Sequence, residues 1–306
     1  MKIKPVWIVF LAALFLALPA RIYQLFFLLD VKEDTYKYGG LSSAIILSLL
    51  GLSILLILIL SYVNKSAPEE YKPVKSVPTA AFCALTGAAI IFHAFVSMAD
   101  TKEEANTALS IIGSATGSGQ LYAMRVFLSL FGIMAGLVIL ITAYNFLQGV
   151  NMFHHFPLVA LIPSLWGCVN LAVLFVTDTA SVNVAENAFD MFNVIFTLLF
   201  LFSQSRLFAG IDVKKNMKSA YMFGLPCILL ALVTSVSGVA FSFYRKVSFT
   251  SLSMSSYLMN ICMAIYIILF LISAQRSQYP NQKHLKPRNI KDTKDNGAAS
   301  KAIRKL

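Results

Sequence analysis

The sequence predicts an all-α polytopic membrane helix bundle with about eight transmembrane helices. Composition is the first reason: 58% of the 306 residues are hydrophobic and 13% are charged, whereas soluble domains carry about 25% charged residues. The second reason is that apolar runs of about 18 residues or more recur along the chain, and each can cross a bilayer as a helix. Although the length would suit two or three soluble domains, the composition excludes them.

Eight spans follow from these apolar runs. A backbone that faces lipid must satisfy its own hydrogen bonds, so each run is expected to be helical. Successive spans then form four helical hairpins. The expected spans are Val6–Leu29, Leu41–Val63, Thr79–Val96, Leu121–Leu147, Leu158–Phe175, Ala185–Leu207, Ala220–Phe243 and Leu252–Ala274.

An internal repeat is one interpretation of this order. The sixth and eighth spans end alike, because Leu199–Arg206 matches Leu269–Arg276 at five of eight positions. The alternative is that many apolar helices end with Leu and Phe, then Ser, then Arg. Each odd-numbered span is also expected to begin beside a proline, where the missing N–H costs little. These prolines are Pro5, Pro78, Pro157 with Pro163, and Pro226.

Basic residues predict the orientation. With an even number of spans, both termini share one side of the membrane, and that side carries eighteen loop and tail Lys and Arg residues against five on the other. The positive-inside rule therefore predicts a multi-pass plasma-membrane protein with both termini cytoplasmic. Arg245 and Lys246 contradict the rule locally. Leu18–Ala20 resembles a signal cleavage site, but the apolar run continues to Leu29, so an uncleaved first helix is expected.

Charged and polar side chains interrupt several spans. Each charge costs about 2.5 to 3.5 kcal/mol on insertion scales, so it needs a partner or water. Three of these residues are spaced i, i+4 and i+7 and share one helix face. In the predicted topology the whole set falls within the outer ~12 Å of the membrane. The candidate polar cluster is Arg21, His93, Arg125, Asn170, Glu186, Asp190 and Asn193.

Two function classes follow from this cluster. If the side chains line water, the protein binds or transports a small solute or ion through an outward-facing polar cluster. If they pair with one another, the protein is a non-catalytic membrane scaffold or sensor component whose intramembrane charges are structural ion pairs. A membrane enzyme ranks third, because the chain has no HExxH, GxSxG or HxxxH motif. No catalytic residue, cofactor or metal site is therefore predicted.

The remaining motifs predict packing and connections. Gly132–Gly136 is a GxxxG sequence that allows close helix approach. Gly113–Gly119 lacks the GK[ST] ending of a phosphate loop and is interpreted as a linker. It belongs to a long outer loop, Met98–Gln120, in which Glu103–Ile112 is expected to form a short surface helix. The four cysteines are widely spaced and interpreted as small buried hydrophobic residues.

The C-terminal segment differs from the bundle. Residues 1–276 form the predicted transmembrane bundle, and residues 277–306 a basic, disordered cytoplasmic tail whose acidic residues are Asp292 and Asp295. Basic residues beside the inner leaflet gain about 1 kcal/mol each from anionic lipid. The predicted partners are therefore the lipid bilayer and its anionic headgroups, rather than nucleic acid.

One segment carries a resemblance. Leu161–Ile211 runs from Pro163-Ser-Leu-Trp166 through Glu186 and Asp190 to Arg206-Leu-Phe-Ala-Gly210. It resembles a stretch of uncharacterised multi-pass membrane proteins of Gram-positive, clostridial-type bacteria. The resemblance covers about one sixth of the chain, and it implies a bacterial plasma-membrane location but no activity.

Overall fold

The computed structural model describes residues 4–30, 35–36, 41–63, 75–112, 118–178, 184–245 and 253–277. These residues contain eight helices long and apolar enough to cross a membrane, which confirms the predicted all-α polytopic bundle. The predicted tail, residues 277–306, lies outside them from residue 278 onward. The helices are α1 (Lys4–Tyr23), α2 (Leu41–Val63), α3 (Val77–Ile112), α4 (Ser118–Gln148), α5 (Ile162–Asp178), α6 (Val184–Phe208), α7 (Val213–Arg245) and α8 (Met254–Ser277).

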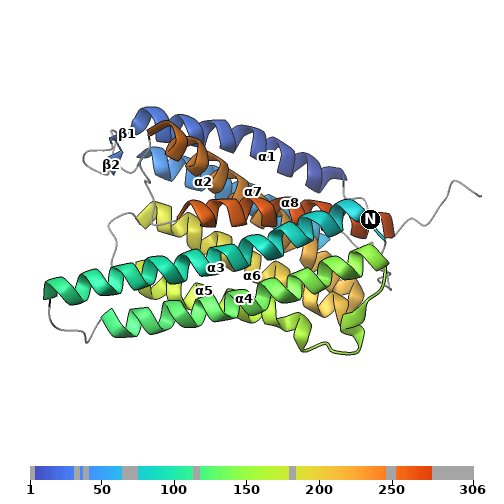
Figure 1. The fold of residues 1–306 in the computed structure, drawn as a ribbon. Helices are drawn as coiled ribbons and strands as arrows, with labels where there is room; N and C mark the ends of the chain where they lie inside the picture. Colours follow the sequence, from blue (N-terminus) through green and yellow to red (C-terminus); the bar gives the residue numbers. More distant parts are fainter. Residues whose placement is uncertain are drawn as a thin grey trace, which may run out of the picture.

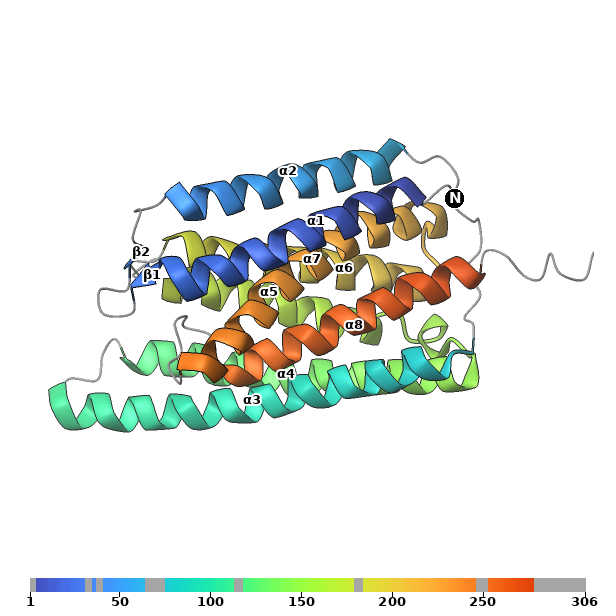
Figure 2. The same cartoon turned by 90° about the horizontal axis from the view of Figure 1, so that it is seen from above.

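The helices form a closed series of neighbours. Each helix from α3 to α8 contacts the next one, and α8 returns to contact α3, so these six make a ring. The α1–α2 hairpin packs against α7 from outside that ring (Figures 1 and 2). In the most apolar stretch of α7, 67% of the residues are buried, whereas 28% are buried in the corresponding stretches of α1 and of α2. Helix α7, which lies between the ring and the α1–α2 hairpin, is therefore at the centre of the bundle.

The two ends of the bundle carry different connections. We call the end where α1 begins and α8 ends the inner end, and the opposite end the outer end. At the outer end α1 continues as a π-helical turn, Gln24–Leu28, followed by strand β1 (Leu29–Asp30), which pairs antiparallel with β2 (Thr35–Tyr36). At the inner end 3-10 turns at Met152–His154 and Val159–Leu161 connect α4 to α5.

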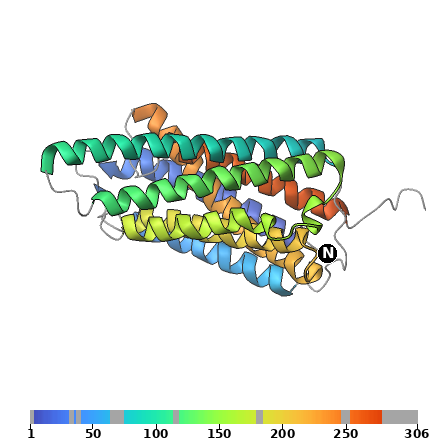
Figure 3. The ribbon, with the colours of Figure 1, turned by 60° about the horizontal axis from the view of Figure 1, so that its bottom comes forward.

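The prediction of a long outer loop at Met98–Gln120 is wrong. Helix α3 continues without a break to Ile112, so Glu103–Ile112 extends the span and is not a separate surface helix. The segment lacks Gly and Pro and contains good helix formers such as Lys102 and Ala105, and such a sequence stays helical after hydropathy has fallen. The outer end of α3 consequently projects beyond the other helices (Figures 1 and 3).

Pro226 also lies elsewhere than predicted. We expected it at the start of its span, but α7 begins at Val213, and Pro226 stands inside the helix. The apolar run starts later than the helix because Lys214, Lys215 and Lys218 occupy its first turns. Pro5, Pro78 and Pro163 do lie in the first turns of α1, α3 and α5.

Helices α3 and α4 approach each other closely at two glycines. A Cβ atom on Gly136 would lie 2.8 Å from the carbonyl oxygen of Gly87 and 2.5 Å from Cγ1 of Ile91. A Cβ atom on Gly132 would lie 3.3 Å from Ala94 and from Nε1 of Trp166. The GxxxG prediction of close helix packing is confirmed, and the contact is within one chain.

Aromatic rings fill the inner half of the ring. Phe270 of α8 makes edge-to-face contacts with Phe146 of α4, Phe200 of α6 and Phe208 of α6, with centroid distances of 6.1, 5.7 and 6.2 Å. All four side chains are buried. We call Phe146, Phe200, Phe208 and Phe270 the aromatic plug.

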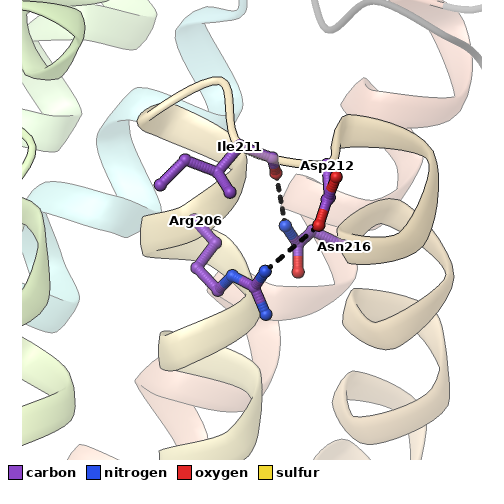
Figure 4. A network of polar contacts seen from close by, with 4 residues as sticks. All are labelled: Arg206, Ile211, Asp212 and Asn216. Carbon is purple, nitrogen blue, oxygen red and sulfur yellow. Dashed lines mark hydrogen bonds and ion pairs between the residues drawn. The ribbon is translucent and has the colours of Figure 1, made fainter.

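The connection between α6 and α7 is short and polar. Gly210 and Asp212 have positive φ angles of 73° and 42°, which reverse the chain direction. Arg206 Nη2 lies 3.5 Å from Oδ2 of Asp212, and Asn216 Nδ2 donates to the carbonyl oxygen of Ile211 (Figure 4). This turn holds α6 and α7 antiparallel at the inner end.

A hydrogen bond from a buried hydroxyl joins α7 to α8, and the effect of removing that hydroxyl is a first testable prediction. Tyr221 donates from its hydroxyl to the carbonyl oxygen of Leu271 at 2.7 Å. Because this bond is buried, Tyr221→Phe is expected to lower the free energy of unfolding by about 1 kcal/mol. Denaturant unfolding in detergent micelles measures the change. Tyr144, which is exposed on α4, provides the control Tyr144→Phe; an equal effect of both changes would contradict the assignment.

Candidate functional site

Arg21 is a buried charge near the outer end of α1. It is 2% exposed, and its Nη1 atom donates to Oε1 of Gln24 at 2.5 Å. Gln24 Nε2 donates in turn to the hydroxyls of Ser42 and Ser43 at 3.2 and 2.9 Å. Gln24 opens the π-helical turn, a rare element that is frequent at functional sites. The guanidinium is thereby connected to the first turn of α2.

The same guanidinium reaches α6. Cζ of Arg21 lies 5.1 Å from the ring centroid of Phe189, a distance within the range of a cation–π interaction. The next residue of α6 is Asp190, which is 7% exposed. The structure thus brings a buried cation of α1 beside the segment of α6 that carries a buried carboxylate.

A polar seam continues along α6 from this point. Its members are spaced by three, four and seven residues, so they share one face of the helix. Thr197 lies at the contact with α7, since its Oγ1 is 3.1 Å from Sγ of Cys227. Asn193 lies one turn before it and is 3% exposed. We define the α6 polar seam as Asp190, Asn193, Thr197 and Gln204.

The predicted member Glu186 extends this spacing by one turn on the backbone of α6, but its side chain lies outside the described part. Thr197 and Gln204 are additional members that the sequence analysis missed. The signal for them was present, because the heptad-like spacing that selects Asp190 and Asn193 continues through both positions.

A buried hydroxyl of α7 lies level with the outer part of the seam. Two contacts define the antiparallel register: Thr197 meets Cys227, and Phe200 lies 3.1 Å from a Cβ placed on Gly224. Continued outward at about 1.5 Å per residue, this register brings Ser235 to the level of Asp190. Ser235 is fully buried and its Oγ has no hydrogen-bond partner among the described residues.

The inner end of the seam is bonded to α8. Gln204 Nε2 donates to the hydroxyl of Tyr266, and both side chains are buried. On the other side of α8, Thr79 of α3 donates to the carbonyl oxygen of Leu269 at 3.5 Å. Together with the aromatic plug, these contacts close the inner half of the ring.

His93 belongs to a second polar group. Its Nδ1 lies 2.9 Å from Oγ of Ser255 in α8. Ser253, which precedes α8, has its hydroxyl 2.7 Å from that of Ser255 and 3.1 Å from that of Ser256. The sequence predicted the depth of His93 in the outer half, but this pairing depends on the α3–α8 contact, which the sequence did not reveal.

The other predicted members are placed on α4 and α5. Arg125 is half-buried, and its carbonyl oxygen accepts a hydrogen bond from Ser129 at 3.0 Å. Asn170 is half-buried on α5.

One of the four free cysteines, Cys168, is exposed, because α5 turns that side away from its neighbours. This corrects the expectation that all four are buried. No group of three or more metal-ligating His, Cys, Asp or Glu side chains occurs in the described ranges.

The geometry at the outer end suits the binding of a small polar or charged group. It combines a buried carboxylate, an amide, a hydroxyl and a nearby guanidinium inside the bundle, where low polarity strengthens each electrostatic contact. Hydrogen bonding and charge are what this set of groups offers a ligand. Comparisons of the chain with protein-family models, with curated proteins and with solved structures find no match.

Proposed function

We propose that this multi-pass membrane protein binds a small solute or ion at the outer end of its ring and carries it across the membrane. The observation that supports the proposal is the α6 polar seam, which faces the buried helices α7 and α8 instead of the bundle surface. Polar side chains inside a membrane are expensive and typically mark solute or ion pathways.

The position of the aromatic plug supports an outward-facing form. In the outer half, Asp190, Asn193 and Ser235 bring polar atoms into the interior. In the inner half, the aromatic plug fills the space between α4, α6 and α8. If the positive-inside orientation holds, a solute would reach the seam from outside and would be stopped by the plug.

The alternative function is a scaffold or sensor component. The contacts of Arg21 favour it, because the guanidinium lies over the Phe189 ring of α6 and bonds to Gln24. Gln24 bonds in turn to two serine hydroxyls of α2, so these contacts join three helices. In that case the outer polar groups would stabilise the fold and would never meet water. Access of water to Asn193 therefore separates the two proposals.

A thiol-labelling experiment measures that access. In a variant whose four native cysteines are replaced by alanine, we expect Asn193→Cys to react with a positively charged, membrane-impermeant methanethiosulfonate added outside intact cells. Phe200 lies two turns further in on the same face and is fully buried. Phe200→Cys should therefore stay unmodified.

Two results would contradict transport through this site. The first is that Asn193→Cys labels no faster than Phe200→Cys although both proteins elute as folded monodisperse species, which would favour the scaffold. Equal labelling of both from outside would show that the aromatic plug does not close the inner half. A reaction confined to Asn193→Cys supports the proposal.

A further inference from the structure

We infer that the outer part of the seam holds a small monovalent cation, coordinated by the side-chain oxygens of Asn193 and Ser235. This inference rests on the proposed function, since it names the occupant of the same site. It starts from two buried atoms whose hydrogen-bonding capacity is unused.

Asn193 and Ser235 each present an oxygen without a partner. The side chains are 3% and 0% exposed, and neither Asn193 Oδ1 nor Ser235 Oγ has a hydrogen-bond partner among the described residues. More than about 90% of buried polar groups in proteins are bonded, and an unsatisfied one costs about 1 to 3 kcal/mol. Two such oxygens on facing helices therefore indicate a ligand.

The register of α6 and α7 places these two residues at neighbouring levels of the contact between the helices. Asn193 lies two turns from Phe200, and Ser235 lies three turns from Gly224, so both project toward the side where Phe200 and Gly224 meet. Their levels along the bundle differ by about 6 Å. Two oxygens that bind one cation at about 2.3 to 2.6 Å lie no more than about 5 Å apart, so the two side chains would lean toward each other across this offset.

The other unpartnered oxygens lie in different surroundings. Besides Asn193 and Ser235, four buried oxygens have no hydrogen-bond partner among the described residues, those of Ser61, Asn145, Asn151 and Gln204. The amides of Gln204 and Asn151 are already bonded through their nitrogens, to the hydroxyl of Tyr266 and to the carbonyl oxygen of Phe208. Asn145 and Ser61 are the other two. They stand near the inner ends of α4 and α2, within one or two turns of the last helical residue. Helices α4 and α2 are not neighbours in the bundle, whereas Asn193 and Ser235 lie on α6 and α7, which contact each other.

The chemistry of the site favours a cation over an anion. An amide oxygen accepts hydrogen bonds and never donates them, and small hard cations prefer carbonyl, hydroxyl and carboxylate oxygens. Asp190 adds negative charge one turn from Asn193. An anion at this level would be repelled by that carboxylate.

A single charge on the ion fits better than two. Divalent ions are held by several carboxylates, and the described part of the chain has no group of three or more acidic or other metal-ligating side chains. The guanidinium of Arg21 lies over Phe189, the residue before Asp190, and a positive charge in this segment repels a divalent ion more than a monovalent one. The oxygens suit sodium, a larger alkali cation or ammonium, and the experiment separates these ions.

Thermal unfolding of the full chain in detergent tests the inference. The salts are lithium, sodium, potassium, ammonium and choline chloride at equal ionic strength, so that the anion stays constant. We expect one small cation to raise Tm above the choline value in a saturable manner. Asn193→Ala and Ser235→Ala should abolish that rise, and the matched controls Asn145→Ala and Ser61→Ala should retain it.

Conservative variants guard against loss of folding. Asn193→Gln and Ser235→Thr keep an oxygen and should fold, but we expect them to change which cation gives the largest rise. Identical Tm values in all five salts would overturn the inference, as would a rise that persists in both alanine variants. If Asn193→Cys labels from outside while no cation raises Tm, the cation inference fails and the proposed function stands.

Discussion

Replacing Gly136 with leucine is expected to destabilise the bundle more than any other single change proposed for its packing. Even a Cβ atom there would lie 2.8 Å from the carbonyl oxygen of Gly87, and backbone cannot move aside as a side chain does. Overpacking typically costs about 1 to 3 kcal/mol, and a leucine that must separate α3 from α4 should reach the upper end. The yield of monodisperse protein and its unfolding temperature in detergent measure the effect.

Gly51 supplies the matched control. It lies in α2, and a Cβ atom placed on it would have nothing within 4 Å. Gly51→Leu should therefore leave both yield and unfolding temperature unchanged. If the two leucine variants behaved alike, the close α3–α4 approach would not contribute to stability.

Replacement of Arg21 with methionine is expected to be the most damaging loss of a polar contact. Methionine has similar volume but cannot donate to Gln24 or interact with the Phe189 ring through charge. A hydrogen bond to a charged group contributes about 1.5 to 3 kcal/mol, and the loss of the contact with the Phe189 ring adds to this cost. Chemical unfolding in micelles of the single variant, of Gln24→Leu and of the double variant should reveal strong non-additivity.

Arg206 is the control for this prediction. It also stacks over a phenylalanine, with Cζ 5.7 Å from the Phe202 ring, but its ionic partner Asp212 is 65% exposed. Arg206→Met should cost no more than about 1 kcal/mol, as is usual for surface ion pairs. Equal losses at both arginines would mean that burial of Arg21 adds nothing.

Hydropathy predicted most of the fold because lipid imposes a simple rule on length and polarity. The span Leu41–Val63 matches α2 at both ends. The errors occur where helices leave the apolar layer: α3 continues to Ile112 and α7 begins at Val213. Helix propensity decides those boundaries, and an apolar run contains no information about them.

The candidate site was less predictable, because it depends on which helices are neighbours. Charge alone identified Arg21 and Asp190 in the sequence. Ser235 gave no such signal, since serine is common in membrane helices and often bonds to its own backbone. Its unpartnered hydroxyl becomes meaningful only when the α6–α7 register places it opposite the seam.

The contact between α3 and α8 has a consequence for how the chain assembles. Thr79 and Leu269, which meet there, are separated by 190 residues. During synthesis from the N-terminus, every other helix of the ring must therefore enter the membrane before the ring can close. Until α8 arrives, the side of α6 that bears Gln204 lacks Tyr266 and must face lipid or a chaperone. Helix α8, the last helix of the ring to be made, thus completes the burial of the polar interior, and a chain shortened before it should be an early target for membrane proteases.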